Sequence, residues 1–255
     1  MIWRSATFSN VGRAPSPAVD ALVGLPALIF LSFTLHAATI TGHVQLTSSQ
    51  DPNVRKHQDY SGVVVWLAPT SGAATVPVAT HHAEMVQKNK TFLPHILPIT
   101  VGTIVDFPNR DPIFHNAFSN YNGQVFDVAL YPPGTSKSIA FRREGVVRVF
   151  CNIHPTMSAV IVVLKSPYFA VSDKRGSWRM AEVPAGSYQL HVFHERATDE
   201  TLAALTRTIE IPASDLDLPV IAVSESGYLQ LPHKNKYGKD YPPAVDGVGY
   251  PGEKP

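Results

Sequence analysis

The chain has 255 residues, of which 44% are hydrophobic, and its formal net charge at pH 7 is +1. This length allows one or two domains, and the apolar content is sufficient for a real core. Acidic and basic residues are nearly balanced and interspersed, which excludes the usual nucleic-acid-binding protein, since such proteins carry a basic face.

The first 38 residues have the layout of a secretory signal peptide. Arg4 and Arg13 precede an apolar run at 21–35, and Ala37 and Ala38 supply small residues for cleavage. The run, of about 15 residues, is short for a bilayer span. An uncleaved N-terminal anchor is the alternative. We therefore expect a periplasmic or secreted protein with no membrane span in its mature form.

The rest of the chain predicts an all-β protein. Twenty-two prolines and sixteen glycines punctuate runs rich in valine and isoleucine, a pattern typical of short strands joined by turns. We expect strands at 38–46, 62–69, 98–108, 137–143, 145–151, 158–166 and 205–213, with three more between 172 and 195.

Helical patterns are few after residue 40, and the C-terminal part has no periodicity. Residues 197–205 form a modest helix candidate, whereas 54–60 are interpreted as a loop. The alternation of Tyr188, Leu190 and Val192 places these side chains on one face of a strand. The tail, 225–255, is rich in Pro, Gly, Lys and Tyr and is expected to be an extended or disordered arm.

The stretch VRVFCNIHPTM holds the only cysteine, Cys151, with His154 three residues later and Met157 three residues after that. One cysteine forms no internal disulfide. A thiolate, an imidazole and a weak thioether, joined by a second imidazole from elsewhere, form the ligand set of a blue-copper site. With eleven His and four Met in the chain, this spacing is improbable by chance. A buried core cysteine beside an unrelated histidine is the alternative.

The best candidate for the second imidazole is His115. It follows a predicted strand and the turn PNRDP, and it lies 36 residues before Cys151, so only a fold can join the two. Asn116 comes next and is expected to tie the two ligand loops together by hydrogen bonding, which fixes ligand geometry.

Residues 80–165 resemble the cupredoxins of the plastocyanin and amicyanin type. With one shifted residue in the strand, the positions that carry the resemblance are Phe92, Pro94, Val101, Gly102, Val105, Phe107, Asn109, His115, Asn116, Cys151 and His154. The short Cys-x-x-His-x-x-Met spacing is the amicyanin-like one. The whole sequence also resembles bacterial periplasmic proteins labelled methylamine utilisation proteins. The interval from His115 to Cys151 is shorter than in plastocyanin, which implies trimmed strands and a more open site.

This resemblance implies a Greek-key β-sandwich at 80–166 that carries one type 1 copper. His115, Cys151 and His154 would be equatorial ligands and Met157 the axial one. The expected partner is a redox protein such as a c-type cytochrome or a dehydrogenase. His95 lies where the copper end of the sandwich is expected, as a neighbour of the ligands or an additional ligand; a surface histidine is the alternative.

Residues 168–210 resemble a second family, the carboxypeptidase regulatory-like or carbohydrate-binding-like β-sandwich. Its turn and core positions match Asp173, Gly176, Val183, Pro184, Gly186, Tyr188, Leu190 and Val192. We assign 39–79 to the start of this small sandwich and 167–224 to the rest, so that the cupredoxin is inserted between its second and third strands. The alternative gives 39–70 to the cupredoxin. This sandwich is a candidate site for a carbohydrate or protein ligand.

Motifs of common enzymes are absent, so no enzymatic activity is expected. Asp106, Asp111 and Asp127 are interpreted as turn formers and solvated charges. Three functions therefore compete: a copper electron carrier, a protein that stores, delivers or senses copper, and a binding module with an accessory copper site.

Overall fold

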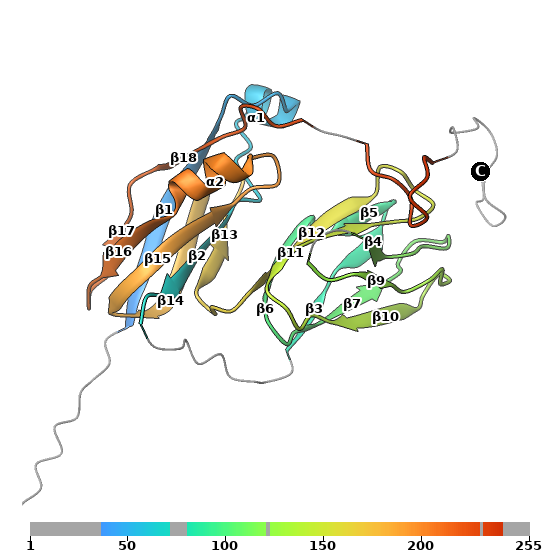
Figure 1. Ribbon diagram of the computed structural model, residues 1–255, viewed down its shortest axis with the longest axis horizontal. Coiled ribbons are helices and arrows are strands. Elements are labelled where there is room, and N and C mark those ends of the chain that lie inside the picture. The colour runs from blue at the N-terminus through green and yellow to red at the C-terminus, as the bar shows by residue number, and fades with distance from the viewer. Residues whose placement is uncertain (1–36, 72–80, 121–122, 230–231, 242–255) are drawn as a thin grey trace, which may run out of the picture. The chain divides into compact units, whose positions relative to one another are not determined.

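The computed structural model describes residues 37–71, 81–120, 123–229 and 232–241. Nearly all regular elements in these ranges are strands (Figure 1), as the sequence predicted. None of the helices in these ranges has the length and apolarity that a bilayer crossing requires. The predicted signal peptide lies outside the described residues, except that the first strand already begins at Ala37.

Strands from the two ends of the described chain form what we call the flanking sandwich. One sheet has the order β14-β1-β17, with β18 also paired to β1, and the other has the order β13-β2-β15-β16. The bounds are β1 (Ala37–Thr47), β2 (Val64–Pro69), β13 (Phe169–Val171), β14 (Ser177–Pro184), β15 (Gly186–Phe193), β16 (Arg207–Ile211), β17 (Leu216–Asp217) and β18 (Ile221–Ser224).

The pairing of β2 bears on whether the cupredoxin is inserted. Val65 lies opposite Val192 and Leu67 opposite Leu190 in an antiparallel pair with β15. This is the pairing that the inserted arrangement predicts. The side chains of Tyr188, Leu190 and Val192 are all buried in the same core, as their alternation predicted.

Strands between β2 and β13 form what we call the central sandwich. Its sheets have the orders β10-β7-β3 and β6-β12-β11-β8-β9, and β4 and β5 form a hairpin. The bounds are β3 (His82–Glu84), β4 (Val86–Lys88), β5 (Thr91–Leu93), β6 (Ile96–Thr100), β7 (Ile104–Pro108), β8 (Phe118–Ser119), β9 (Phe126–Asp127), β10 (Ser136–Ala140), β11 (Gly145–Phe150) and β12 (Ser158–Leu164).

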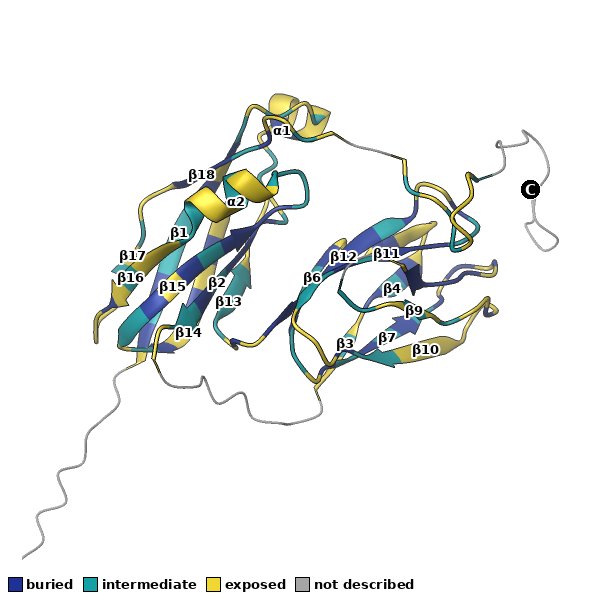
Figure 2. Ribbon diagram, viewed as in Figure 1, coloured by how far each residue is buried: buried dark blue, intermediate teal, exposed yellow. Residues whose placement is uncertain are grey.

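Strand β12 is buried on both faces, which explains its uninterrupted apolar sequence. Ala159, Ile161 and Val163 face the core of the central sandwich, which also contains Cys151 and Met157. The alternate residues of β12 pack in a separate cluster with residues of β2 and β15. Figure 2 shows this strand in the colour of buried residues. Because β12 begins directly after Met157, the most deeply packed strand anchors one end of the ligand loop.

Two sequence predictions about elements need correction. The expected strand at 98–108 is two strands, β6 and β7, separated by a turn in which Gly102 has a φ of +96°. The expected loop at 54–60 contains helix α1 (Pro52–His57), because Asp51 caps its N-terminus by accepting a hydrogen bond from the Asn53 amide. Helix α2 (Asp199–Leu205) lies where the modest helix candidate was placed.

Part of the segment predicted as an extended or disordered arm, 225–255, packs on the two sandwiches. Glu225 is buried and pairs with His194, so the flanking sandwich extends into the predicted tail. Residues 232–241 make specific hydrogen bonds with the central sandwich, including one from Tyr241 to Cys151. Residues 242–255 lie outside the described part.

Candidate metal centre

The candidate ligands come from two loops of the central sandwich. His115 lies between β7 and β8 and is fixed by an isolated bridge to Tyr131. Cys151 follows β11 directly, and His154 and Met157 lie in the turn before β12. This turn is closed by its backbone, because the Cys151 amide donates to Met157 O at 3.1 Å and the Met157 amide donates to His154 O at 3.1 Å.

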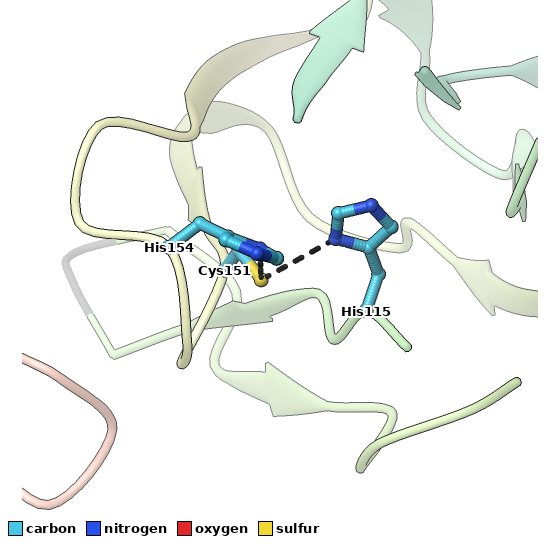
Figure 3. Close-up of side chains that lie close together, drawn as sticks. All are labelled: His115, Cys151 and His154. Atoms are coloured by element: carbon cyan, nitrogen blue, oxygen red, sulfur yellow. Dashed lines mark hydrogen bonds between the residues drawn. The ribbon is translucent and has the colours of Figure 1, made fainter. Parts of the chain in front are cut away.

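The fold brings three of the predicted ligands together (Figure 3). Cys151 Sγ lies 3.5 Å from His154 Nδ1 and 3.9 Å from His115 Nδ1. All three ligand atoms lie within 4.8 Å of one another. The exposed fractions of His115, Cys151 and His154 are 0%, 0% and 7%. Met157 is also fully buried and belongs to the same core as Cys151.

The two sulfur–nitrogen separations fit one bound metal ion, whereas the two imidazole nitrogens, within 4.8 Å of each other, would have to approach to about 4.2 Å or less to share it. An ion about 2.0–2.1 Å from an imidazole nitrogen and about 2.3 Å from a thiolate sulfur holds the two ligand atoms roughly 3.6–3.9 Å apart at ordinary coordination angles. The measured sulfur–nitrogen distances of 3.5 and 3.9 Å are close to this range. The soft thiolate and thioether suit Cu(I), and the imidazoles suit copper in both oxidation states. The donor set therefore fits copper.

Asp111 fixes the orientation of His115. Its Oδ2 lies 2.7 Å from His115 Nε2, and both side chains are buried. Burial by itself would raise the pKa of Asp111, but hydrogen bonds from the Lys90 amide, from His115 and from the Asn89 amide outweigh burial and hold this pKa below its ordinary value. The carboxylate is therefore ionised at neutral pH and can only accept a hydrogen bond.

The tautomer of His115 follows from this contact. Since Asp111 only accepts, Nε2 of His115 carries the proton, and Nδ1 presents its lone pair toward Cys151. Burial lowers the pKa of His115, and the nearby carboxylate opposes this shift without outweighing it. The imidazole is therefore neutral at pH 7, as a metal ligand must be.

The interpretation of Asp111 as a solvated turn former was wrong. Its side chain is 8% exposed and contacts a candidate ligand. The sequence signal that was available is the four-residue spacing of Asp111 and His115, but the same aspartate in PNRDP is an ordinary turn residue. Asp106 is more conventional and forms a partly exposed pair with His82.

The surroundings of Cys151 both oppose and favour its thiolate. Burial raises the pKa of the thiol, and hydrogen bonds from the backbone of Ile153, Asn116 and His154 offset only part of this rise. Without a metal the sulfur is therefore protonated at neutral pH. A metal ion that binds there must displace this proton, after which the same amides stabilise the thiolate.

Asn116 links the two ligand loops, as expected. Its Oδ1 accepts a hydrogen bond from the Asn152 amide at 3.3 Å, and its Nδ2 donates to Asp127 Oδ1 at 2.7 Å. Asp127 also accepts a hydrogen bond from Lys236 in the C-terminal segment. Asp127 is thus part of this network rather than a simple solvated charge, and no pattern in the sequence indicated the contribution from Lys236.

His95 lies apart from the ligand cluster. Its Nδ1 lies 3.1 Å from Ser158 O, and its Nε2 lies 2.9 Å from the Glu195 carboxylate of the flanking sandwich. The His95 side chain is 47% exposed. His95 contacts Ser158, the residue after Met157, but it does not belong to the group of possible metal ligands formed by His115, Cys151 and His154.

The chain was compared with families and proteins that are already known. No family model matches the chain. It is 35% identical over 79 residues to the methylamine utilization protein MauL of Methylorubrum extorquens. The match covers 31% of this chain and 63% of MauL, so the chain spans less than two thirds of that relative.

Two solved structures are also similar. A purple cupredoxin from Nitrosopumilus maritimus is 28% identical with a TM-score of 0.29, covering 33% of this chain and 99% of that one. A reduced tryptophan-to-tyrosine variant of amicyanin is 20% identical with a TM-score of 0.32, covering 39% and 98%. At TM-scores this low, neither likeness carries an argument about this chain. The two sheets of the central sandwich and the buried His–Cys–His cluster at their loops define a cupredoxin-like fold.

Proposed function

We propose that this protein is an exported type 1 copper protein that carries single electrons between redox partners. The observation that carries the proposal is the buried cluster of His115, Cys151 and His154, whose ligand atoms lie within 4.8 Å of one another. When bound, copper would supply a one-electron couple between Cu(I) and Cu(II). His115 and His154 would hold it through Nδ1, Cys151 through Sγ, and Met157 as a weak axial donor.

A rigid, buried site suits an electron carrier. The hydrogen bonds of Asp111 and Asn116 hold the two ligand loops independently of a metal. Residues that orient ligands in this way tune metal sites strongly. A site that keeps the same geometry in both oxidation states loses little energy to reorganisation when an electron moves. No substrate need enter it.

Storage or delivery of copper is the second candidate function. The burial of the candidate ligands argues against it. A delivery protein must hand its ion to another protein, which requires exposed ligands that exchange easily. Here Cys151 is fully buried and His154 is 7% exposed. For a glycan-binding or partner-binding role of the flanking sandwich, with the copper site as an accessory, the described residues offer no comparable group of metal-ligating side chains.

The cellular setting is proposed on separate grounds. The apolar run near the N-terminus supports export to the periplasm or beyond. The name of the relative MauL supports a role in methylamine utilisation. The redox partner that we propose is a protein such as a dehydrogenase or a c-type cytochrome. We place the cupredoxin at 80–166, inserted between 39–79 and 167–224 of the second sandwich.

Absorption spectroscopy of the purified protein tests the function. Cu(II) should produce an intense visible charge-transfer band from the Cys151 thiolate, with a reversible one-electron midpoint potential. Cys151→Ser should abolish the band, while Ser158→Ala, at the start of β12, should keep it. Zinc should bind without colour, since it has no accessible redox state. A colourless copper complex that loses Cu(I) quickly to a chelator would instead support delivery.

A further inference from the structure

The C-terminal segment, residues 232–241, packs against the junction between β11 and the ligand loop. It is drawn in red in Figure 1. The Tyr241 hydroxyl donates to Cys151 O at 2.8 Å, and the Lys236 amide donates to Asn152 Oδ1 at 3.0 Å. The ring of His233 stacks on Phe150, with centroids 4.1 Å apart and planes 25° apart. Three consecutive residues, Phe150 to Asn152, are thus each held by a different residue of the segment.

Lys236 also closes a ring of hydrogen bonds around the two ligand loops. Its Nζ donates to Asp127 Oδ2 at 2.8 Å, and its amide donates to Asn152. The Asn152 amide donates to Asn116 Oδ1, and Asn116 Nδ2 donates to the other oxygen of Asp127. The ring therefore joins the residue after His115, the residue after Cys151, and the C-terminal segment.

The segment is itself folded, so it can act as a rigid support. Asn235 Oδ1 accepts hydrogen bonds from the amides of Tyr237 and Lys239, and the Asn235 amide donates to Lys239 O. An ion pair between Lys234 and Asp240 closes the same turn. His233 and Tyr241, at the two ends of this turn, meet edge to face with ring centroids 5.2 Å apart.

We propose that residues 232–241 are a positioning element of the copper site, and that Lys236 and Tyr241 hold the loop that carries Cys151 and His154 in its ligating geometry. This inference rests on the proposed function. The contacts fall on the residues beside the thiolate ligand. Restricting the loop lowers the entropy that it would lose when it closes around an ion. Outer groups that orient ligands typically contribute 10- to 100-fold in metal affinity.

Two conservative variants test the proposal, each with a matched control. Tyr241→Phe removes only the hydroxyl bonded to Cys151, and Tyr228→Phe removes a hydroxyl outside the segment. Lys236→Met removes the ion pair with Asp127, whereas Lys239→Met removes an exposed ammonium. All four side chains keep their approximate size.

The first measurement is the rate at which a Cu(I) chelator removes copper from the reduced full-length protein. Tyr241→Phe and Lys236→Met should each speed removal by about 10-fold or more, whereas the two controls should match the wild type. The second measurement is hydrogen exchange in the copper-free protein. The amides of Cys151, Asn152 and Met157 should exchange about 10-fold faster in the test variants.

The outcomes separate the two proposals. If the wild type shows no thiolate-to-copper band, the proposed function fails and this inference fails with it. If the wild type shows the band but both test variants match their controls in copper release and in exchange, only the inference about the segment is wrong. Equal acceleration in the controls would also overturn it, because the effect would then be general destabilisation.

Discussion

Asp111 is buried against the candidate ligand His115 in the structure, although it was predicted to be a solvated turn residue. It accepts a hydrogen bond from His115 and from two backbone amides, so its negative charge is buried beside the candidate copper site. A fixed negative charge near the metal favours Cu(II) over Cu(I). It also selects the His115 tautomer in which Nδ1 can bind a metal.

We expect Asp111→Asn to weaken copper binding by about 10- to 100-fold and to raise the midpoint potential. Loss of the charge destabilises Cu(II) relative to Cu(I); a tenfold change in their relative stability corresponds to about 59 mV. Titration with copper and voltammetry measure the two effects. Asp106→Asn is the matched control, because it removes a carboxylate paired with the exposed His82. A lowered or unchanged potential in Asp111→Asn would contradict this account.

The candidate ligands and Asn116 were identified from the sequence, while Asp111 and Lys236 were not. Cys151, His154 and Met157 are close in sequence, and their chemistry identifies them without a fold. Asp111 was missed because an aspartate between two turn residues has an ordinary local explanation. Lys236 lies 84 residues after Asn152, its hydrogen-bond partner, in a polar stretch without periodicity. Only the folded chain shows that these polar groups turn toward the ligand loops.

At the scale of elements, the turn between β6 and β7 shows what periodicity leaves out. Both strands are apolar, so the sequence from 98 to 108 resembles one long strand. Gly102 breaks it with a φ of +96°, which other residues adopt only with strain. The Gly102 amide donates to Phe141 O at 2.7 Å, and the Val101 amide donates to Leu164 O at 2.8 Å. The turn therefore lies at the end of β12 opposite the ligand loop.

Gly102→Ala should destabilise the protein by about 1–2 kcal/mol, the usual penalty for placing a side chain in left-handed backbone. No atom lies within 4 Å of the position of an added Cβ, so the cost comes from the backbone alone. Urea unfolding of the copper-free protein measures the loss. The charge-transfer band of the copper form should stay unchanged, because the turn lies far from the ligands. An altered band would show that the two ends of the sandwich are coupled.

At the scale of the whole molecule, the flanking sandwich is built from strands that are far apart in the sequence. The resemblance of 168–210 to a regulatory-like sandwich stays a prediction, and it left two connectivities open. The pairing of β2 with β15 requires strands more than 100 residues apart to meet, which sequence periodicity cannot reveal. Closure of the flanking sandwich therefore depends on contacts between distant segments, and several of these converge on Glu225.

Glu225 joins the ends of three strands of the flanking sandwich. Its carboxylate accepts hydrogen bonds from His194 Nε2 at 2.9 Å, from Arg196 Nε at 3.1 Å and from Ser49 Oγ at 2.6 Å. Its side chain is only 3% exposed. Burial would raise the pKa of Glu225, but the bonds from these three partners and the charge of Arg196 outweigh it and lower the pKa to about 2.

Because the pKa of Glu225 is lowered in the folded state, the free energy of unfolding should decrease as the pH falls. A carboxylate with a depressed pKa in the folded state stabilises the fold fully above its ordinary pKa, and this contribution is lost as pH falls toward the folded value. For Glu225 the window runs from pH about 4.5 to about 2, and the contribution at neutral pH is on the order of 2–3 kcal/mol. We expect Glu225→Gln to lose this contribution.

Urea unfolding of the copper-free protein at several pH values measures the difference in unfolding free energy between wild type and Glu225→Gln. The difference should be largest near pH 7 and should shrink as the pH falls below about 4.5. Glu144→Gln is the control, since Glu144 pairs with Lys165 at 2.9 Å with both side chains well exposed. Surface pairs contribute only about 0–1 kcal/mol, so this variant should follow the wild type throughout. A difference for Glu225→Gln that stays constant with pH would mean that Glu225 acts by packing and not by its charge.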